Sequence, residues 1–155
     1  MKKIKFIQLC GLPASGKTTY LKDHYKSYVK VSLDDIRRIF FGHQFHQNAE
    51  GYVVANAKNM VRILLEQGHS VVLDSTALLF QFRREWKNLA ESYGAEYSVV
   101  YFETPLSECL RRNKLREKNK RVPKDVLVRM SVQLEIPDTF VNVPECCPVK
   151  TIWSE

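Results

Sequence analysis

A short segment near the N-terminus carries the clearest chemistry in the chain. The pattern G-x-x-x-x-G-K-[ST], which wraps backbone N–H groups around phosphates in nucleotide-binding loops, is matched by Gly11, Leu12, Pro13, Ala14, Ser15, Gly16, Lys17 and Thr18. Glycine suits both ends because the loop adopts backbone conformations that other residues resist. Lys17 is expected to reach the β- and γ-phosphates, and the hydroxyl of Thr18 to bind Mg²⁺. The segment therefore predicts a site for a nucleotide and Mg²⁺.

The sequence on either side of this loop supports the same interpretation. The apolar residues 3–10 are typical of a buried strand, and residues 18–28 are typical of a helix. The helix N-terminus would direct its dipole at the same phosphate. The sequence has no Asn-Lys-x-Asp segment of the kind that recognises guanine, and 155 residues are too few for the extra domains of a motor ATPase. A small phosphotransferase is the favoured class.

Further polar residues follow the second and third predicted strands. Asp34 and Arg37 come after the second strand and would share one face of a helix, and Asp74 closes the third strand. In a parallel α/β sheet, the carboxyl ends of these strands lie beside the phosphate loop. A carboxylate there can accept the proton of an attacking hydroxyl, and an arginine can hold a phosphate. The alternatives are a surface ion pair between Asp34 and Arg37, and a helix-capping role for Asp74.

The elements that must hold these residues alternate between strand and helix. Strands are predicted at residues 3–10, 28–32, 70–74, 96–102 and, in the C-terminal tail, 149–153. Helices are predicted at residues 18–28, 34–41, 50–67, 82–93, 105 to about 118, and 125–134, with Thr104 as an N-cap. This alternation predicts an α/β protein with the P-loop NTPase/kinase fold, in which helices flank a mainly parallel sheet of four or five strands. The length predicts a single domain, residues 1–155.

The net charge of +7 is concentrated in one place. Residues 111–124 hold eight bases and one acid, an excess as large as that of the whole chain. A focused basic segment suits a polyanion such as nucleic acid or nucleotide phosphates, although a solvated helix face is the alternative. The sequence shows neither a signal peptide nor an apolar span, and the four cysteines lack metal-ligand spacing. We therefore expect a cytoplasmic protein that does not contact a membrane.

Taken together, these motifs resemble a known family. The phosphate loop, the Asp34-Asp35-Ile36-Arg37 segment, the Asp74-Ser75-Thr76 segment and the basic stretch from Arg111 to Arg116 are similar to the kinase domain of phage and bacterial 5′-hydroxyl polynucleotide kinases. That family lies within the wider adenylate-kinase-like and zeta-toxin-like P-loop group. The resemblance runs from Met1 to about Leu134.

The resemblance implies a role for each of several residues. Asp34 falls on the general base and Arg37 on the arginine that steadies the 3′-phosphate of the acceptor. Arg112 and Arg116 fall on arginines of a basic helical lid, about residues 107–124, that clamp the phosphates of ATP. The implied reaction moves the γ-phosphate of ATP to the 5′-hydroxyl end of RNA or DNA.

Other acceptors are left open by the same residues. The stretch from Gln133 to Pro137 also resembles relatives that phosphorylate seryl-tRNA or bind tRNA-modifying machinery. One alternative is therefore a kinase of a small molecule or an aminoacyl-tRNA. The other is a module that binds ATP to regulate a partner. Oligomeric state is not predicted.

The full prediction assigns residues to four roles. The catalytic residues are Lys17, Asp34, Arg37 and Arg116. The ATP-binding residues are Gly11, Pro13, Ala14, Ser15, Gly16, Lys17, Thr18, Thr19, Arg112 and Arg116, with Thr18 as the Mg²⁺ ligand. The acceptor-binding residues are Asp34, Arg37, Asp74 and Arg83. Arg83 and Arg84 would track a nucleic-acid backbone, His43 and His46 lie in a loop near the acceptor, and Phe40, Phe41 and Phe45 either pack in the core or support a terminal base.

Overall fold

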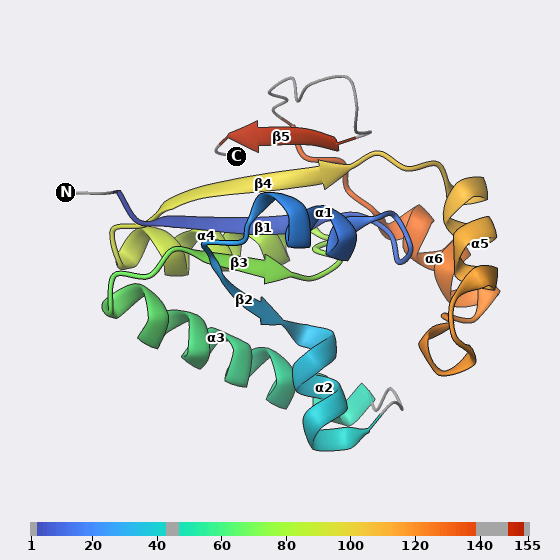
Figure 1. The fold of residues 1–155 in the computed structure, drawn as a ribbon, viewed down its shortest axis with the longest axis horizontal. Helices are drawn as coiled ribbons and strands as arrows, with labels where there is room; N and C mark the ends of the chain where they lie inside the picture. Colours follow the sequence, from blue (N-terminus) through green and yellow to red (C-terminus); the bar gives the residue numbers. More distant parts are fainter. Residues whose placement is uncertain (1–2, 43–46, 139–148, 154–155) are drawn as a thin grey trace.

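The computed structural model describes residues 3–42, 47–138 and 149–153. These residues form a five-stranded sheet in the order β2-β3-β1-β4-β5 (Figure 1). The strands are β1 (Lys5–Cys10), β2 (Val29–Ser32), β3 (Val71–Asp74), β4 (Glu96–Phe102) and β5 (Val149–Trp153). The first four are parallel, and β5 runs antiparallel to β4 along one edge. The predicted α/β class with a mainly parallel sheet is confirmed.

Helices cover both faces of this sheet. The α-helices are α1 (Lys17–His24), α2 (Leu33–Phe41), α3 (Glu50–Glu66), α4 (Phe80–Ser92), α5 (Leu106–Leu115) and α6 (Lys124–Gln133). Two short 3₁₀ turns, η1 (Gln47–Ala49) and η2 (Lys118–Lys120), precede α3 and α6. Figure 1 shows α5 and α6 beyond the carboxyl ends of the strands, with α2 at the same end of the molecule.

The two-residue period of the strands builds a core on each face. Phe6 and Cys10 of β1 point toward α3 and α4, whereas Ile7 and Leu9 point toward α1. Phe6 is fully buried and stacks on the rings of both Trp86 and Tyr97, with centroid distances of 5.9 Å. A third, smaller cluster joins α5 and α6 to the phosphate loop. Helices α5 and α6 are thereby packed directly against the phosphate loop.

Several predicted helix boundaries differ from the structure: α4 starts two residues earlier than predicted, and α5 ends at Leu115 rather than at about residue 118. The first helix ends at His24, because the chain turns at Tyr25, whose ring packs edge-on against Tyr28. The predicted N-cap role of Thr104 is wrong: α5 starts at Leu106 behind Pro105, and no side chain caps it. The hydroxyl of Thr104 instead donates a hydrogen bond to the carbonyl of Ser15, at 2.9 Å. A residue expected to serve its own helix therefore holds the phosphate loop.

In the described part of the chain, no helix has both the length and the apolar character that crossing a membrane would require.

Candidate nucleotide and acceptor site

The phosphate loop lies between β1 and α1 and depends on unusual backbone angles. Gly11, Ala14 and Gly16 have positive φ angles of 153°, 62° and 105°. Such alternation turns successive N–H groups toward one point, which makes an anion-binding concavity. Gly11 is also sterically required, because a Cβ atom there would lie 2.9 Å from the Cβ of Phe102. Its amide donates to the carbonyl of Thr76, at 2.9 Å, and so ties the loop to the segment after β3.

Lys17 folds back over this loop. Its Nζ donates hydrogen bonds to the carbonyls of Gly11 at 2.8 Å and Leu12 at 2.7 Å, and the residue is 8% exposed. Burial lowers the pKa of Lys17, while the Asp74 and Asp34 carboxylates act in the opposite direction. A phosphate in the loop would supply the counter-charge that these neutral carbonyls do not.

Substituting Lys17 with methionine should separate stability from phosphate binding. Because burial lowers the pKa of Lys17, the folded protein loses this proton at a lower pH than the unfolded chain. Between the two pKa values the unfolded chain binds more protons, so the contribution of Lys17 to the stability of the wild type rises with pH up to about 10.5. Without ATP, we expect Lys17→Met to be the more stable protein at pH 7, with the difference shrinking toward pH 10. Urea unfolding of both proteins across this pH range measures the difference in their free energy of unfolding. A difference that does not change with pH would contradict the attribution to the Lys17 pKa.

Thr18 and Asp74 bring a hydroxyl and a carboxylate together beside the loop. The Thr18 hydroxyl donates to Oδ2 of Asp74 at 3.1 Å, and Asp74 is 9% exposed. Burial raises the pKa of Asp74, and Lys17 and Lys30 oppose this rise. Hard oxygen donors of this kind fit Mg²⁺, which keeps few protein ligands and takes the rest from water and phosphate. The donor set is therefore suited to the predicted ion, with Thr18 as a ligand and Asp74 beside it.

Lys30 is a residue of this site that sequence analysis missed. From β2, its Nζ lies 3.1 Å from Oδ2 of Asp35 and 4.0 Å from Oδ2 of Asp74. One cation thus faces the carboxylates at the ends of two neighbouring strands. A lysine between two valines of a four-residue strand was the available signal.

Asp34 and Arg37 meet at the start of α2, as their spacing predicted. Ser32 caps this helix by accepting a hydrogen bond from the amide of Asp35, which places Asp34 in the first turn. The Asp34 side chain is 88% exposed and is hydrogen-bonded by Nη1 of Arg37. An exposed carboxylate held at the carboxyl end of β2 is available to a hydroxyl that approaches from solvent.

The guanidinium fork of Arg37, however, binds Glu50, which was not among the predicted residues. Its Nε and Nη2 donate to the two carboxylate oxygens of Glu50, at 2.6 and 2.9 Å. The hydrogen bonds to Glu50 raise the pKa of Arg37. In this structure the fork cross-links α2 to the first turn of α3. Glu50 was missed because the packing of these two helices is not visible in sequence.

Removing this cross-link should cost stability. We expect Glu50→Ala to lower the free energy of unfolding by about 1.5–3 kcal/mol, because it leaves the half-buried guanidinium of Arg37 without its fork partner. The matched control is Glu66→Ala on the same helix, which breaks an exposed pair with Arg62 and should cost less than about 0.5 kcal/mol. Chemical denaturation of both variants makes the comparison, and equal losses would show that Glu50 is an ordinary surface acid.

The basic lid is built around Arg112. Its Nε donates to Glu108 at 2.7 Å and its Nη1 to the carbonyl of Ser15 at 3.3 Å, so it lies against the phosphate loop. Hydrogen bonds from Arg111 and Arg112 hold the pKa of Glu108 down to about 2. Arg116 follows the end of α5, and no acid among the described residues pairs with its side chain.

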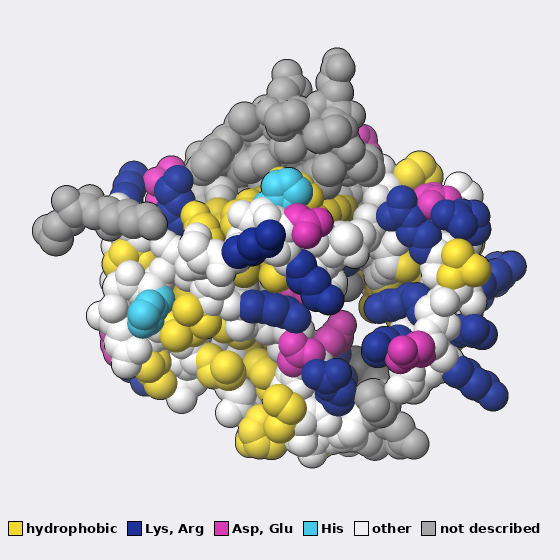
Figure 2. Space-filling view, viewed as in Figure 1, with side chains coloured by type: hydrophobic (Ala, Val, Ile, Leu, Met, Phe, Trp, Pro, Cys, Tyr) yellow, Lys and Arg dark blue, Asp and Glu magenta, His cyan; other side chains and the backbone are white. Residues whose placement is uncertain are grey.

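The loop that carries Arg116 is closed at its base. Asn113 donates to the carbonyl of Val122 at 2.7 Å and accepts from its amide at 3.0 Å. The segment between them is rich in lysine and arginine, and Figure 2 shows these side chains gathered at the α5–α6 end of the molecule, across a hollow from acidic side chains. We call residues 114–121 the basic loop.

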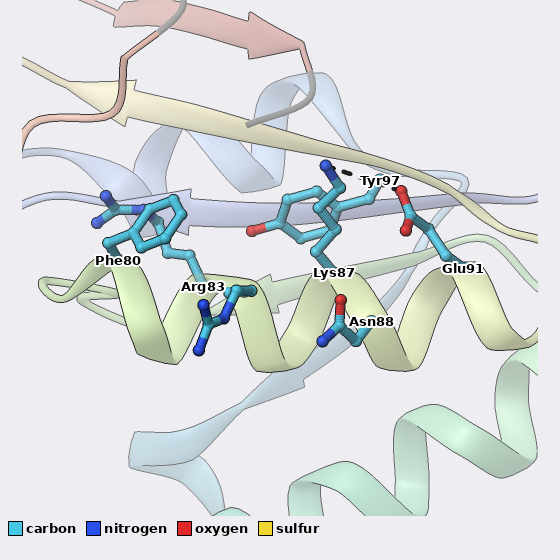
Figure 3. A pocket seen from close by; sticks show the side chains of 7 residues that line it. Phe80, Arg83, Lys87, Asn88, Glu91 and Tyr97 are labelled. Carbon is cyan, nitrogen blue, oxygen red and sulfur yellow. Dashed lines mark ion pairs between the residues drawn. The ribbon is translucent and has the colours of Figure 1, made fainter.

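The acceptor-binding role predicted for Arg83 is wrong. Its residue is 1% exposed, and its Nη1 donates to the carbonyls of Ala77 at 2.8 Å and Leu78 at 3.2 Å. Arg83 shares the inward face of α4 with Trp86 and Ala90, and together with Lys87 and Tyr97 it lines a cavity of about 240 Å³ between α4 and β4 (Figure 3). A guanidinium buried in this way cannot track a nucleic-acid backbone. It fixes the segment that follows β3 instead.

The other predicted residues divide into two groups. The structure brings the loop residues, Asp34, Asp74 and Arg112 to one end of the sheet. His43, His46 and Phe45 lie outside the described residues.

A phosphate loop on the β1–α1 turn, beneath a basic helical segment and beside the ends of parallel strands, defines a P-loop kinase domain. The chain belongs to the AAA domain family AAA_33, whose profile matches residues 6–137. The predicted resemblance to P-loop kinases is thereby confirmed.

Three known proteins are similar to this chain. It is 27% identical over 139 residues to the L-seryl-tRNA(Sec) kinase of Methanococcus maripaludis, covering 86% of this chain and 53% of that protein. The chain thus spans about half the length of this relative. A chain of the Pnkp1/Rnl/Hen1 RNA repair complex is similar with a TM-score of 0.76 and 24% identity, over 86% of this chain and 45% of that chain. Kti12 of Chaetomium thermophilum, in complex with ADP-AlF3, gives a TM-score of 0.66 and 21% identity, over 86% and 81% of the two chains.

Proposed function

We propose that this protein transfers the γ-phosphate of ATP to the 5′-hydroxyl end of RNA or DNA. The observation that carries the proposal is the exposed carboxylate of Asp34, held by Arg37 at the same end of the sheet as Lys17 and Asp74. A kinase needs such a group to accept the proton of an attacking hydroxyl, whereas a nucleotide switch does not.

Each residue then has a defined task in the transfer. Lys17 and the loop amides hold the phosphates, and Thr18 with Asp74 would hold Mg²⁺, which neutralises phosphate charge when bound. Asp34 takes the proton of the 5′-hydroxyl as its oxygen bonds to the γ-phosphorus. The bond from that phosphorus to the β–γ bridging oxygen breaks, and ADP leaves. Arg116 closes over the transferring group and offsets its charge.

Two observations support a nucleic acid as the acceptor. Residues 111–124, which include the basic loop, hold a positive excess as large as that of the whole chain, and Figure 2 shows basic side chains across a hollow from acidic ones. A cationic wall of this kind attracts a polyanion by long-range electrostatics. The similarity to a chain of an RNA repair complex points the same way.

A second candidate acceptor is the seryl group of a charged tRNA. The observation that favours it is the 27% identity to an L-seryl-tRNA(Sec) kinase. The chemistry would be the same, because Asp34 would accept a proton from a primary hydroxyl in both cases. The two candidates differ in the group that must fit beside α2.

An acceptor assay tests the proposal. γ-labelled ATP and Mg²⁺ are incubated with a 5′-hydroxyl oligoribonucleotide, its 5′-phosphorylated twin, seryl-tRNA, or no acceptor. Label on the 5′-hydroxyl strand alone is the expected result. Label on seryl-tRNA alone would replace the proposal with the second candidate. ATP binding or hydrolysis with no labelled acceptor would overturn both and favour a regulatory module.

A further inference from the structure

An aromatic surface continues from the acceptor residues along α2 and α3. The rings of Phe40 and Tyr52 meet edge to face with centroids 5.5 Å apart, and Phe41 meets Tyr52 in the same way at 5.7 Å. Phe40 is 54% exposed and Tyr52 is 49% exposed, so about half of each residue remains accessible to solvent. We call Phe40, Phe41 and Tyr52 the aromatic platform. Rings clustered on the surface at this density indicate a binding role more often than single exposed apolar residues do.

The platform is fixed to the acceptor residues by the Arg37–Glu50 cross-link. Phe40 follows Arg37 by three residues on α2, and Tyr52 follows Glu50 by two residues on α3. The two hydrogen bonds between Arg37 and Glu50 therefore join the two helices that carry the exposed rings. Six residues of helix separate Asp34 from Phe40, a rise of about 9 Å.

We propose that this platform stacks a base of the acceptor strand within its first three nucleotides, which would make the acceptor a single-stranded nucleic-acid end. The proposal rests on the proposed function. Stacked nucleotides rise about 3.4 Å along a strand, so the rise of about 9 Å along α2 between Asp34 and Phe40 spans between two and three nucleotides. Stacking on aromatic rings is how proteins hold single strands without reading their sequence.

Charge favours a nucleic acid over an apolar protein partner at this surface. Figure 1 shows the segment between α5 and α6, which holds the basic loop, at the same end of the molecule as α2, whose Arg37 and Arg38 are already paired with Asp34, Glu50 and Asp35. A strand that entered between them would place its phosphates near cations and its bases near the rings. The combination of stacking surface and basic groove is typical of single-strand binding.

The test compares intact and abasic substrates on ring variants. Phosphorylation kinetics are measured with 5′-hydroxyl oligonucleotides that are intact or abasic at nucleotide one, two or three. For Phe40→Ala and Tyr52→Ala we expect KM for the intact oligonucleotide to rise about 5- to 100-fold, with KM for ATP unchanged. Removing the stacked base should raise the KM of the wild type for the oligonucleotide by a similar factor. The same change should leave the KM of Phe40→Ala almost unaffected. Phe40→Trp should restore wild-type behaviour.

The matched control is Ile63→Ala, an exposed apolar residue three turns along α3, which should change none of these values. Oligonucleotide binding by fluorescence anisotropy separates this proposal from the proposed function. Binding that depends on Phe40 without phosphorylation would retain the platform and overturn the kinase assignment. Phosphorylation that is insensitive to Phe40 would retain the kinase assignment and overturn the platform. Oligonucleotides that neither bind nor react would also overturn the platform. A concentration-dependent dimer abolished by Phe40→Ala would assign the surface to a second copy of this chain instead.

Discussion

Replacing Asp34 with asparagine is expected to lower kcat for phosphoryl transfer by about 10²–10⁴-fold while leaving ATP binding intact. The asparagine side chain can still accept a hydrogen bond from Arg37, so the local geometry should persist. It cannot take a proton from an attacking hydroxyl. Steady-state kinetics with a 5′-hydroxyl oligonucleotide, together with a fluorescent ATP analogue for binding, separates the two effects.

The control for this experiment is the neighbouring acid. Asp35 lies in the same helical turn but pairs with Lys30 and Arg38, and its amide is bonded to Ser32. Asp35→Asn removes an equal charge and should change kcat by less than tenfold. If Asp35→Asn proved as damaging as Asp34→Asn, the effect would be one of local electrostatics and Asp34 would not be the base.

Removing Arg116 should produce a loss of comparable size. An arginine that closes on a transferring phosphoryl group is worth roughly 10³–10⁵ in rate, so Arg116→Ala is expected to lower kcat by at least about 10³-fold. Among the described residues no acid pairs with its side chain, in contrast to Arg112, which pairs with Glu108 and donates to the carbonyl of Ser15 in the phosphate loop. Single-turnover measurements at saturating ATP would isolate this effect from nucleotide binding.

Lys118→Ala serves as the matched control because it removes one charge from the same basic loop. If Arg116 acts through its guanidinium, Lys118→Ala will retain nearly full activity and Arg116→Lys will recover little. Equal losses in the three variants would indicate that only the summed charge of the loop matters.

The local features of this site could be predicted because their signals are local. The phosphate loop and the Asp34–Arg37 spacing each lie within eight residues, and the structure shows both. The sheet followed from the alternation of strands and helices. Periodicity also held the clue to Arg83, which lies three residues before Trp86 and seven before Ala90 and so belongs to the buried stripe of α4.

The remaining features depend on contacts between distant segments. Thr104 reaches Ser15 across 89 residues, and Glu50 reaches Arg37 only because α2 and α3 pack together. The position of Lys30 near Asp74 requires β2 and β3 to be neighbours in the sheet. None of these pairs has a characteristic spacing in the sequence. Each pair is therefore seen only in the folded chain.

The closed base of the basic loop has a consequence for how the protein responds to salt. Asn113 and Val122 hold the two ends of the loop together, so its like charges cannot move apart by fraying. Counterions must gather around it in solution, and a bound phosphate chain would release them. The entropy gained by the released counterions would then favour closure of the basic loop over ATP. The ionic strength of the solution would set how readily this loop closes.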